Sequence, residues 1–230
     1  MASLCCDLDS KKIMNEKNRT KAYNTFKQNV ESADVLSLIY SSVEEDIETM
    51  PSYKELLRSE YVLLVSAFDT YFHHLILEKL AENLNKEKEH ADLLKANKDI
   101  ISVALGALCD MLFVSTAEDK YSSANTHLNN VTLQRTVKIE NALYHQLNIS
   151  NFRDKFMKEA LLPNYDFDEV LNLEDIIDRR DKIVHESDID PDTRRKRDIS
   201  DGDIRCLKDT LELIVEGTDI HIDKWIQESK

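Results

Sequence analysis

The sequence predicts an all-α protein, and three observations support this fold class. The chain of 230 residues contains only 3 glycines and 3 prolines, far below the usual ~7% and ~5%. Sandwiches, barrels and Rossmann-type folds need more of these turn-forming residues. Hydrophobic residues make up 42% of the chain, enough for a globular core, and they recur at helical spacing.

The first half of the chain predicts three helices. The first runs from about residue 17 to 46 and ends before Pro51. Ser52 and Glu55 form a candidate capping box for a long second helix that ends near Asn85. A polar connector follows at 86–90, and the nearly continuous apolar run at 100–114 predicts a buried helix.

The second half predicts weaker helices first and stronger ones later. Two candidate helices, 137–147 and 152–162, follow a stretch rich in Ser, Thr and Asn. Pro163 marks a turn, and strong helical periodicity returns at 168–185. Residues 186–200 are almost wholly polar and predict an exposed loop. Ser200 with Asp203 then predicts a capped last helix with one apolar side.

The charge restricts the possible partners. The chain has 44 Asp and Glu against 30 Lys and Arg, a net charge of −14. A broad phosphate-binding surface is usually basic, so any contact with nucleic acid must be local.

The sequence also shows no recognisable targeting signal, and its cysteines form no recognisable metal or redox motif. The N-terminus does not read as a secretion signal, and the most apolar run is too short to span a membrane, so we expect a cytoplasmic protein with no membrane partner. The four cysteines, at positions 5, 6, 109 and 206, match neither a zinc site nor a redox pair.

Arg180 is the most unusual residue of the 168–185 helix. It falls within an apolar stripe that includes Ile176, Ile177 and Ile183. A guanidinium there needs a carboxylate or a phosphate. Asp69, on the apolar face of the second helix, is a candidate partner. Two interpretations stay open, a structural buried ion pair and a ligand-binding arginine.

His185 is the second candidate on this helix. Asp181 precedes it by four positions, a spacing that lets a carboxylate orient an imidazole. The alternative is a favourable positive charge at a helix C-terminus. Arg180 and His185 are about 140° apart around a straight helix.

The other basic residues favour an ordinary interpretation. Arg179 and Lys182 lie on the opposite, charged face, where solvated i, i+4 pairs are common. A basic cluster in the following loop, made of Arg194, Arg195, Lys196 and Arg197, is predicted to be solvated. The alternative is functional: all of these cations, including Arg179 and Lys182, would contact RNA.

The string Arg180-Asp181-Lys182-Ile183-Val184-His185 resembles the signature of the HEPN superfamily. Its context, an apolar helix before it and a polar loop and long final helix after it, is similar to the RiboL-PSP-HEPN branch. The segment 61–71 resembles the long helix of that branch, with Asp69 in the acidic position. The resemblance covers about Ser52 to Lys230. Since no internal repeat or linker is evident, we expect a single helical domain over 1–230, with an N-terminal helical extension at 1–51 and a HEPN core at 52–230 that has an insertion near 115–165.

The resemblance also implies an activity. HEPN proteins of this type are metal-independent endoribonucleases without a cofactor, and they act as dimers in which Arg and His of two protomers form one cleft. Arg180 and His185 would be catalytic, with Asp181 and Asp69 supporting. The implied role is a toxin or an effector of antiviral defence, with RNA as substrate and an antitoxin or defence protein as partner.

Two other function classes remain as alternatives. In a non-catalytic interaction module, Arg180 and Asp69 would only lock helices together. A metal-dependent enzyme would need ligands such as Asp69 and His73, but the sequence suggests no third ligand nearby.

Overall fold

The computed structural model describes residues 19–43, 51–85, 132–160 and 173–229, and helices dominate this part of the chain. In chain order they are α1 (Lys21–Ser42), the short 3-10 turn η3 (Pro51–Tyr53), α2 (Lys54–Asn85), α6 (Thr136–Leu147), α7 (Phe152–Glu159), α9 (Leu173–Glu186) and α10 (Asp201–Glu228). The described residues contain no strand beyond one isolated bridge, Ile189 to Lys196. The prediction of an all-α fold is confirmed.

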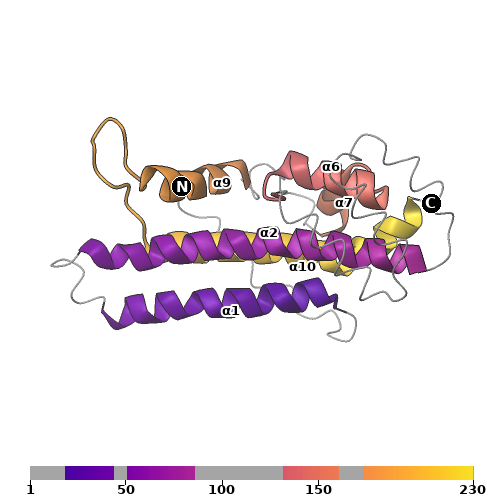
Figure 1. Cartoon of the computed structure of the whole chain (residues 1–230), viewed down its shortest axis with the longest axis horizontal. Coiled ribbons are helices and arrows are strands. Elements are labelled where there is room, and N and C mark those ends of the chain that lie inside the picture. The colour runs from indigo at the N-terminus through magenta and orange to yellow at the C-terminus, as the bar shows by residue number, and fades with distance from the viewer. Residues whose placement is uncertain (1–18, 44–50, 86–131, 161–172, 230) are drawn as a thin grey trace.

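The long helix α2 is the centre of the molecule (Figure 1). Helix α1 runs along one side of it, and α9, α6 and α7 form a layer on the other side. Helix α10 also packs against α2, and a loop connects it to the end of α9. Both α9 and α6 therefore rest on α2, which brings their polar side chains within reach of each other.

Aromatic residues fill the core where α2, α7 and α10 meet. The ring of Phe152 lies 6.4 Å from that of Phe72 and 5.8 Å from that of Trp225, both nearly edge to face. All three side chains are fully buried. Such pairs stabilise a core beyond the area that they bury, so this region holds the layers together.

Polar contacts fix the beginning of α1 on the bundle. Thr20 caps α1 by accepting a hydrogen bond from Tyr23 N, and its hydroxyl donates to the buried Asp219 of α10. The Nζ atom of Lys27 lies 2.7 Å from Glu212 of α10. Since the apolar face of α1 also joins the main core, α1 is part of the same packed unit.

The predicted helix positions agree with the structure wherever the chain is described. Both helices of the weak region are present, as α6 and α7, and Ser200 with Asp203 forms the predicted capping box of α10. The Glu55 carboxylate, expected in a capping box, contacts Arg58 and Lys196. The predicted helix at 100–114 and the turn at Pro163 lie outside the described residues.

The loop at 186–200 differs from its prediction. Two of its residues, Asp188 and Ile199, are buried. The Arg197 N–H donates to the Asp188 carbonyl at 2.8 Å, and the Asp190 N–H donates to the Arg195 carbonyl at 2.8 Å. The segment is thus a hairpin anchored at its base and exposed at its tip.

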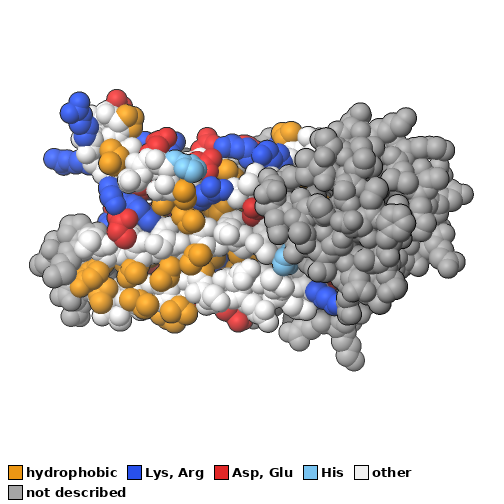
Figure 2. Space-filling model, in the orientation of Figure 1, with side chains coloured by type: hydrophobic (Ala, Val, Ile, Leu, Met, Phe, Trp, Pro, Cys, Tyr) orange, Lys and Arg blue, Asp and Glu red, His pale blue; other side chains and the backbone are white. Residues whose placement is uncertain are grey.

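One face of the molecule shows two kinds of surface (Figure 2). Acidic and basic side chains are mixed over α9, and mainly basic side chains project from the hairpin, whereas hydrophobic side chains gather over α1 and the adjoining part of α2. Exposed apolar residues of these two helices are Val35, Leu38, Ile39 and Leu63. None of the described helices is long and apolar enough to cross a membrane.

Candidate functional site

Helix α9 carries both residues singled out by the sequence. Its buried residues Leu173 and Ile177 pack into the core beside α2. The hydroxyl of Tyr61 in α2 donates to the Ile176 carbonyl at 3.2 Å. One side of α9 is therefore fixed, and its other side faces outward.

Arg180 lies where α9 meets the residues that precede α6. Its Nη2 donates to Oε1 of Gln134, and Nε2 of Gln134 donates to Oδ2 of Asp69 at 3.1 Å. The Leu133 N–H donates to the other oxygen of Asp69. The expected direct pair between Arg180 and Asp69 is therefore wrong, because the amide of Gln134 lies between the two side chains.

Asp181 contacts cations and not the imidazole. Its two carboxylate oxygens lie 3.0 Å from Arg180 Nη1 and 3.4 Å from Arg135 Nη2. The expected i, i+4 contact with His185 is not among the interactions of the described residues. Arg135 also contacts Glu174 and joins the start of α6 to the acidic edge of α9.

These contacts leave Arg180 able to bind an anion. Its side chain is 18% exposed. A guanidinium has five N–H donors in a fixed plane, and the contacts to Gln134 and Asp181 occupy two of them. The remaining donors suit a phosphate, which arginine holds with two parallel hydrogen bonds.

His185 is exposed near the C-terminal end of α9. The helix continues to Glu186 without a break, so the directions of Arg180 and His185 stay about 140° apart. Within one chain, then, the two side chains leave the helix on different sides.

Arg179 is not the solvated surface residue that the sequence suggested. Its Nη2 donates to Oδ2 of Asp188 at 2.8 Å and to the Asp198 carbonyl at 2.9 Å. The side chain of Asp188 is 0% exposed. Arg58 of α2 also contacts this carboxylate, with its Nε 2.9 Å from Oδ2. Arg179 therefore takes part in a buried ion cluster.

The basic hairpin residues divide into two kinds. Lys196 binds Glu55 of α2, and Arg197 donates to the Ile189 carbonyl at 3.0 Å. Arg194 and Arg195 are exposed at the tip. Arg194 and Arg195, with the half-buried Lys182 of α9, have no ion-pair partner among the described residues, whereas the exposed Lys196 is paired with Glu55.

Sequence reasoning missed Gln134, Arg135, Arg58 and Asp188. A signal existed for Arg58, which shares the apolar face of α2 with Tyr61 and Val65, as Arg180 shares that of α9. Gln134 follows a stretch of weak periodicity, and nothing local distinguishes it. In the described ranges, no group of three His, Cys, Asp or Glu residues is arranged to hold a metal ion.

The comparison with family models identifies the chain. The model described as RiboL-PSP-HEPN matches residues 16–224. The chain belongs to the RiboL-PSP-HEPN family. The match to this HEPN family includes α1, which sequence analysis placed in an N-terminal extension. No curated protein and no solved structure matches the chain.

Proposed function

We propose that this RiboL-PSP-HEPN protein is a metal-independent endoribonuclease. The observation that carries the proposal is the arrangement on α9. Arg180 is held in place by Gln134 and Asp181 with donors to spare, and His185 is exposed five residues later. A fixed cation and an accessible imidazole are two of the groups that RNA cleavage through the 2′-hydroxyl needs.

The chemistry assigns a role to each residue. A base must remove the proton of the 2′-hydroxyl, and an acid must protonate the leaving 5′-oxygen. The imidazole of His185 can do either, depending on its protonation state. Arg180 would bind the phosphate and stabilise the charge that develops on its oxygens. The products are a 2′,3′-cyclic phosphate and a 5′-hydroxyl.

Two protomers would complete the site. One chain supplies one imidazole, and its direction differs from that of Arg180 by about 140°. Two exposed apolar residues, Val184 and Ile189, lie on either side of His185 in sequence, and exposed apolar groups often mark contact surfaces. A two-fold dimer across this end of α9 would supply two His185 and two Arg180 side chains to one cleft.

The biological role that we propose is that of a toxin or an effector of antiviral defence. A nuclease of this kind harms its own host, so a protein partner such as an antitoxin would hold it inactive. The net charge of −14 suits a basic partner. Lys182, Arg194 and Arg195 are the remaining cations able to guide RNA locally.

The decisive experiment compares wild type with Arg180→Ala and His185→Ala. Each purified protein is incubated with total RNA in EDTA, and fragment ends are identified. Wild type should give cyclic phosphates, while both variants should lose at least about 10²-fold in rate and keep the helical signal.

A binding module is the second candidate, and one observation favours it. The contacts of Arg180 to Gln134 and Asp181 also serve a purely structural arginine. If dimeric, inhibitor-free wild type leaves RNA intact, the protein is such a module and not a nuclease.

A further inference from the structure

We propose that Asp188 is a positioning residue that holds His185 in place for the reaction. This inference rests on the proposed function. It adds a residue that does not itself take part in the cleavage chemistry. The side chain of Asp188 is buried, and its interactions within the described part of the chain do not include His185. Asp188 acts through the end of α9 and through a cluster of three arginines.

The backbone of Asp188 closes α9. Ser187 and Asp188 have φ angles of 53° and 57°, in the left-handed region. The Asp188 N–H donates to the Lys182 carbonyl at 2.9 Å, six positions back along the chain. This bond spans the last turn of the helix, which is the turn that contains His185.

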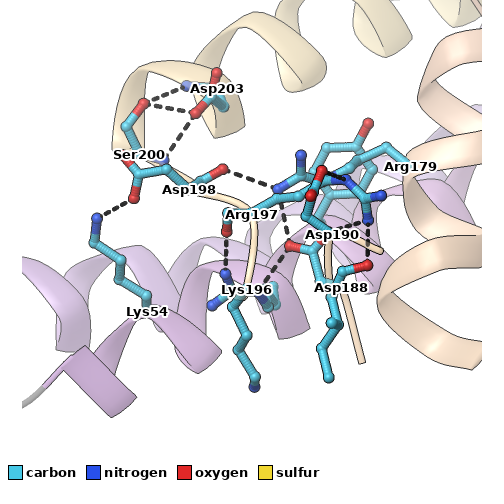
Figure 3. Close-up of polar contacts among 12 residues, drawn as sticks. Lys54, Arg179, Asp188, Asp190, Lys196, Arg197, Asp198, Ser200 and Asp203 are labelled. Atoms are coloured by element: carbon cyan, nitrogen blue, oxygen red, sulfur yellow. Dashed lines mark hydrogen bonds and ion pairs between the residues drawn. The ribbon is translucent and has the colours of Figure 1, made fainter. Parts of the chain in front are cut away.

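The carboxylate of Asp188 is anchored from three elements. Oδ2 lies 2.9 Å from Arg58 Nε of α2 and 2.8 Å from Arg179 Nη2 of α9, and Oδ1 lies 3.8 Å from Arg197 Nη1 of the hairpin. Figure 3 shows Arg179 and Arg197 converging on Asp188. Because the side chain is 0% exposed, little solvent screens these interactions.

The arginines themselves are held in place. Arg58 is 5% exposed, donates to the Arg197 carbonyl and contacts Glu55. Arg179 donates to the Asp198 carbonyl, two residues before the capping box of α10 (Figure 3). The cluster thus joins α2, the hairpin and the start of α10 to one residue at the end of α9.

His185 depends on this anchor because its own side chain is exposed. Helix ends fray, and the last turn is often irregular. An exposed imidazole in a fraying turn would occupy many positions, and displacement of a catalytic group by about 1 Å can reduce the rate ~10²-fold. The Asp188 cluster keeps the last turn helical and so keeps the imidazole in one place.

The test uses Asp188→Asn in the full-length protein. Asparagine has the same shape and tolerates the left-handed conformation, but it lacks the charge that holds the arginines. Asp219→Asn is the matched control, because Asp219 is also 0% exposed and paired with an arginine, Arg19. It lies on α10, away from the end of α9.

Two readouts are measured. The first is the NMR signal of the His185 ring, assigned with His185→Ala. The second is RNA cleavage, resolved into kcat and KM. Asp188→Asn should shift or broaden the His185 signal and lower kcat by about 10- to 100-fold, with KM changed less than about twofold. Asp219→Asn should lower the melting temperature and leave both readouts unchanged.

A folded Asp188→Asn protein with an unchanged His185 signal and unchanged kcat would overturn the inference. If Asp188→Asn does not fold, Arg58→Lys replaces it, because lysine keeps the charge but loses the Nε contact. The His185 signal and the kcat of Arg58→Lys then decide the inference in the same way. If wild type does not cleave RNA, the proposed function fails, while the NMR signal still shows whether Asp188 orders His185.

Discussion

At the scale of single residues, the main finding is that Gln134 connects the two anomalous charges. Sequence periodicity showed that Arg180 and Asp69 both lie on apolar faces. It could not show an amide between them. Gln134 is buried, and it uses its oxygen for Arg180 and its nitrogen for Asp69. Gln134 thereby links Arg180 and Asp69, although these two side chains do not contact each other directly.

Replacing Gln134 tests this network. Gln134→Leu has a similar size but no polar side-chain atoms, and it removes one hydrogen-bond partner from each of the two charged groups, Arg180 and Asp69. We expect the free energy of unfolding to fall by about 1–3 kcal/mol, measured by urea denaturation.

A double-mutant cycle with Asp69→Ala makes the test specific. Residues in one hydrogen-bond network couple by about 0.5–3 kcal/mol. The loss in the double variant should therefore differ from the sum of the two single losses. Simple additivity would mean that Gln134 and Asp69 act independently.

At the scale of helices, α7 and α10 approach each other closely at Gly217. A Cβ atom added to Gly217 would lie 2.7 Å from Ala160 Cβ and 2.8 Å from a ring atom of Phe156. Phe156 is fully buried, so its ring cannot move aside into solvent. The absence of a side chain at Gly217 therefore sets how closely the two helices approach.

Gly217→Ala should destabilise the protein. Alanine improves helix propensity by about 1 kcal/mol, but overpacking a core costs about 1–3 kcal/mol, so the net loss should reach up to about 2 kcal/mol. Gly202→Ala is the control, since its Cβ would meet only Ser200 Oγ, at 3.5 Å. Thermal unfolding should show a lower melting temperature for Gly217→Ala and no decrease for Gly202→Ala.

At the scale of the whole molecule, two properties remain to be tested, self-association and the docking of α1. The first follows from the proposed composite site. Val184 is 47% exposed beside His185, and Val137 on α6 is 58% exposed. These two valines form a matched pair, because only the first lies on the proposed contact surface.

Val184→Glu should weaken the dimer. Burying a charge without a partner costs several kcal/mol, so the dissociation constant should rise by at least about tenfold. Analytical ultracentrifugation measures it, and cleavage should decline in parallel. Val137→Glu should leave the dimer intact. Equal effects of the two substitutions would place the contact surface elsewhere.

The docking of α1 predicts a loss of stability at high pH. Burial and the negative charge of Glu216 raise the pKa of Tyr23 from 10 to about 12. The folded state thus favours the neutral phenol, and this stabilisation is complete below pH 10 and disappears as the pH rises to about 12. Tyr23→Phe should lose less stability than wild type between pH 9.5 and 12 in urea unfolding. Parallel curves for the two proteins would contradict this role.

The sequence by itself determined the all-α class, the boundaries of the described helices to within a few residues, the capping box of α10 and the family signature on α9. Helical periodicity and cap residues are local properties, so they can be read without a partner. Arg180 was visible for the same reason, because a charge in an apolar stripe is a local anomaly.

Only the tertiary structure decided which groups meet. Arg180 and Gln134 are 46 positions apart, and Arg58 and Asp188 are 130 positions apart. Periodicity shows that a face is buried, but it does not show which element covers it. For that reason Arg179 read as a surface residue and Asp188 as part of an exposed loop, although packing of α2 against α9 and the hairpin buries their ion cluster.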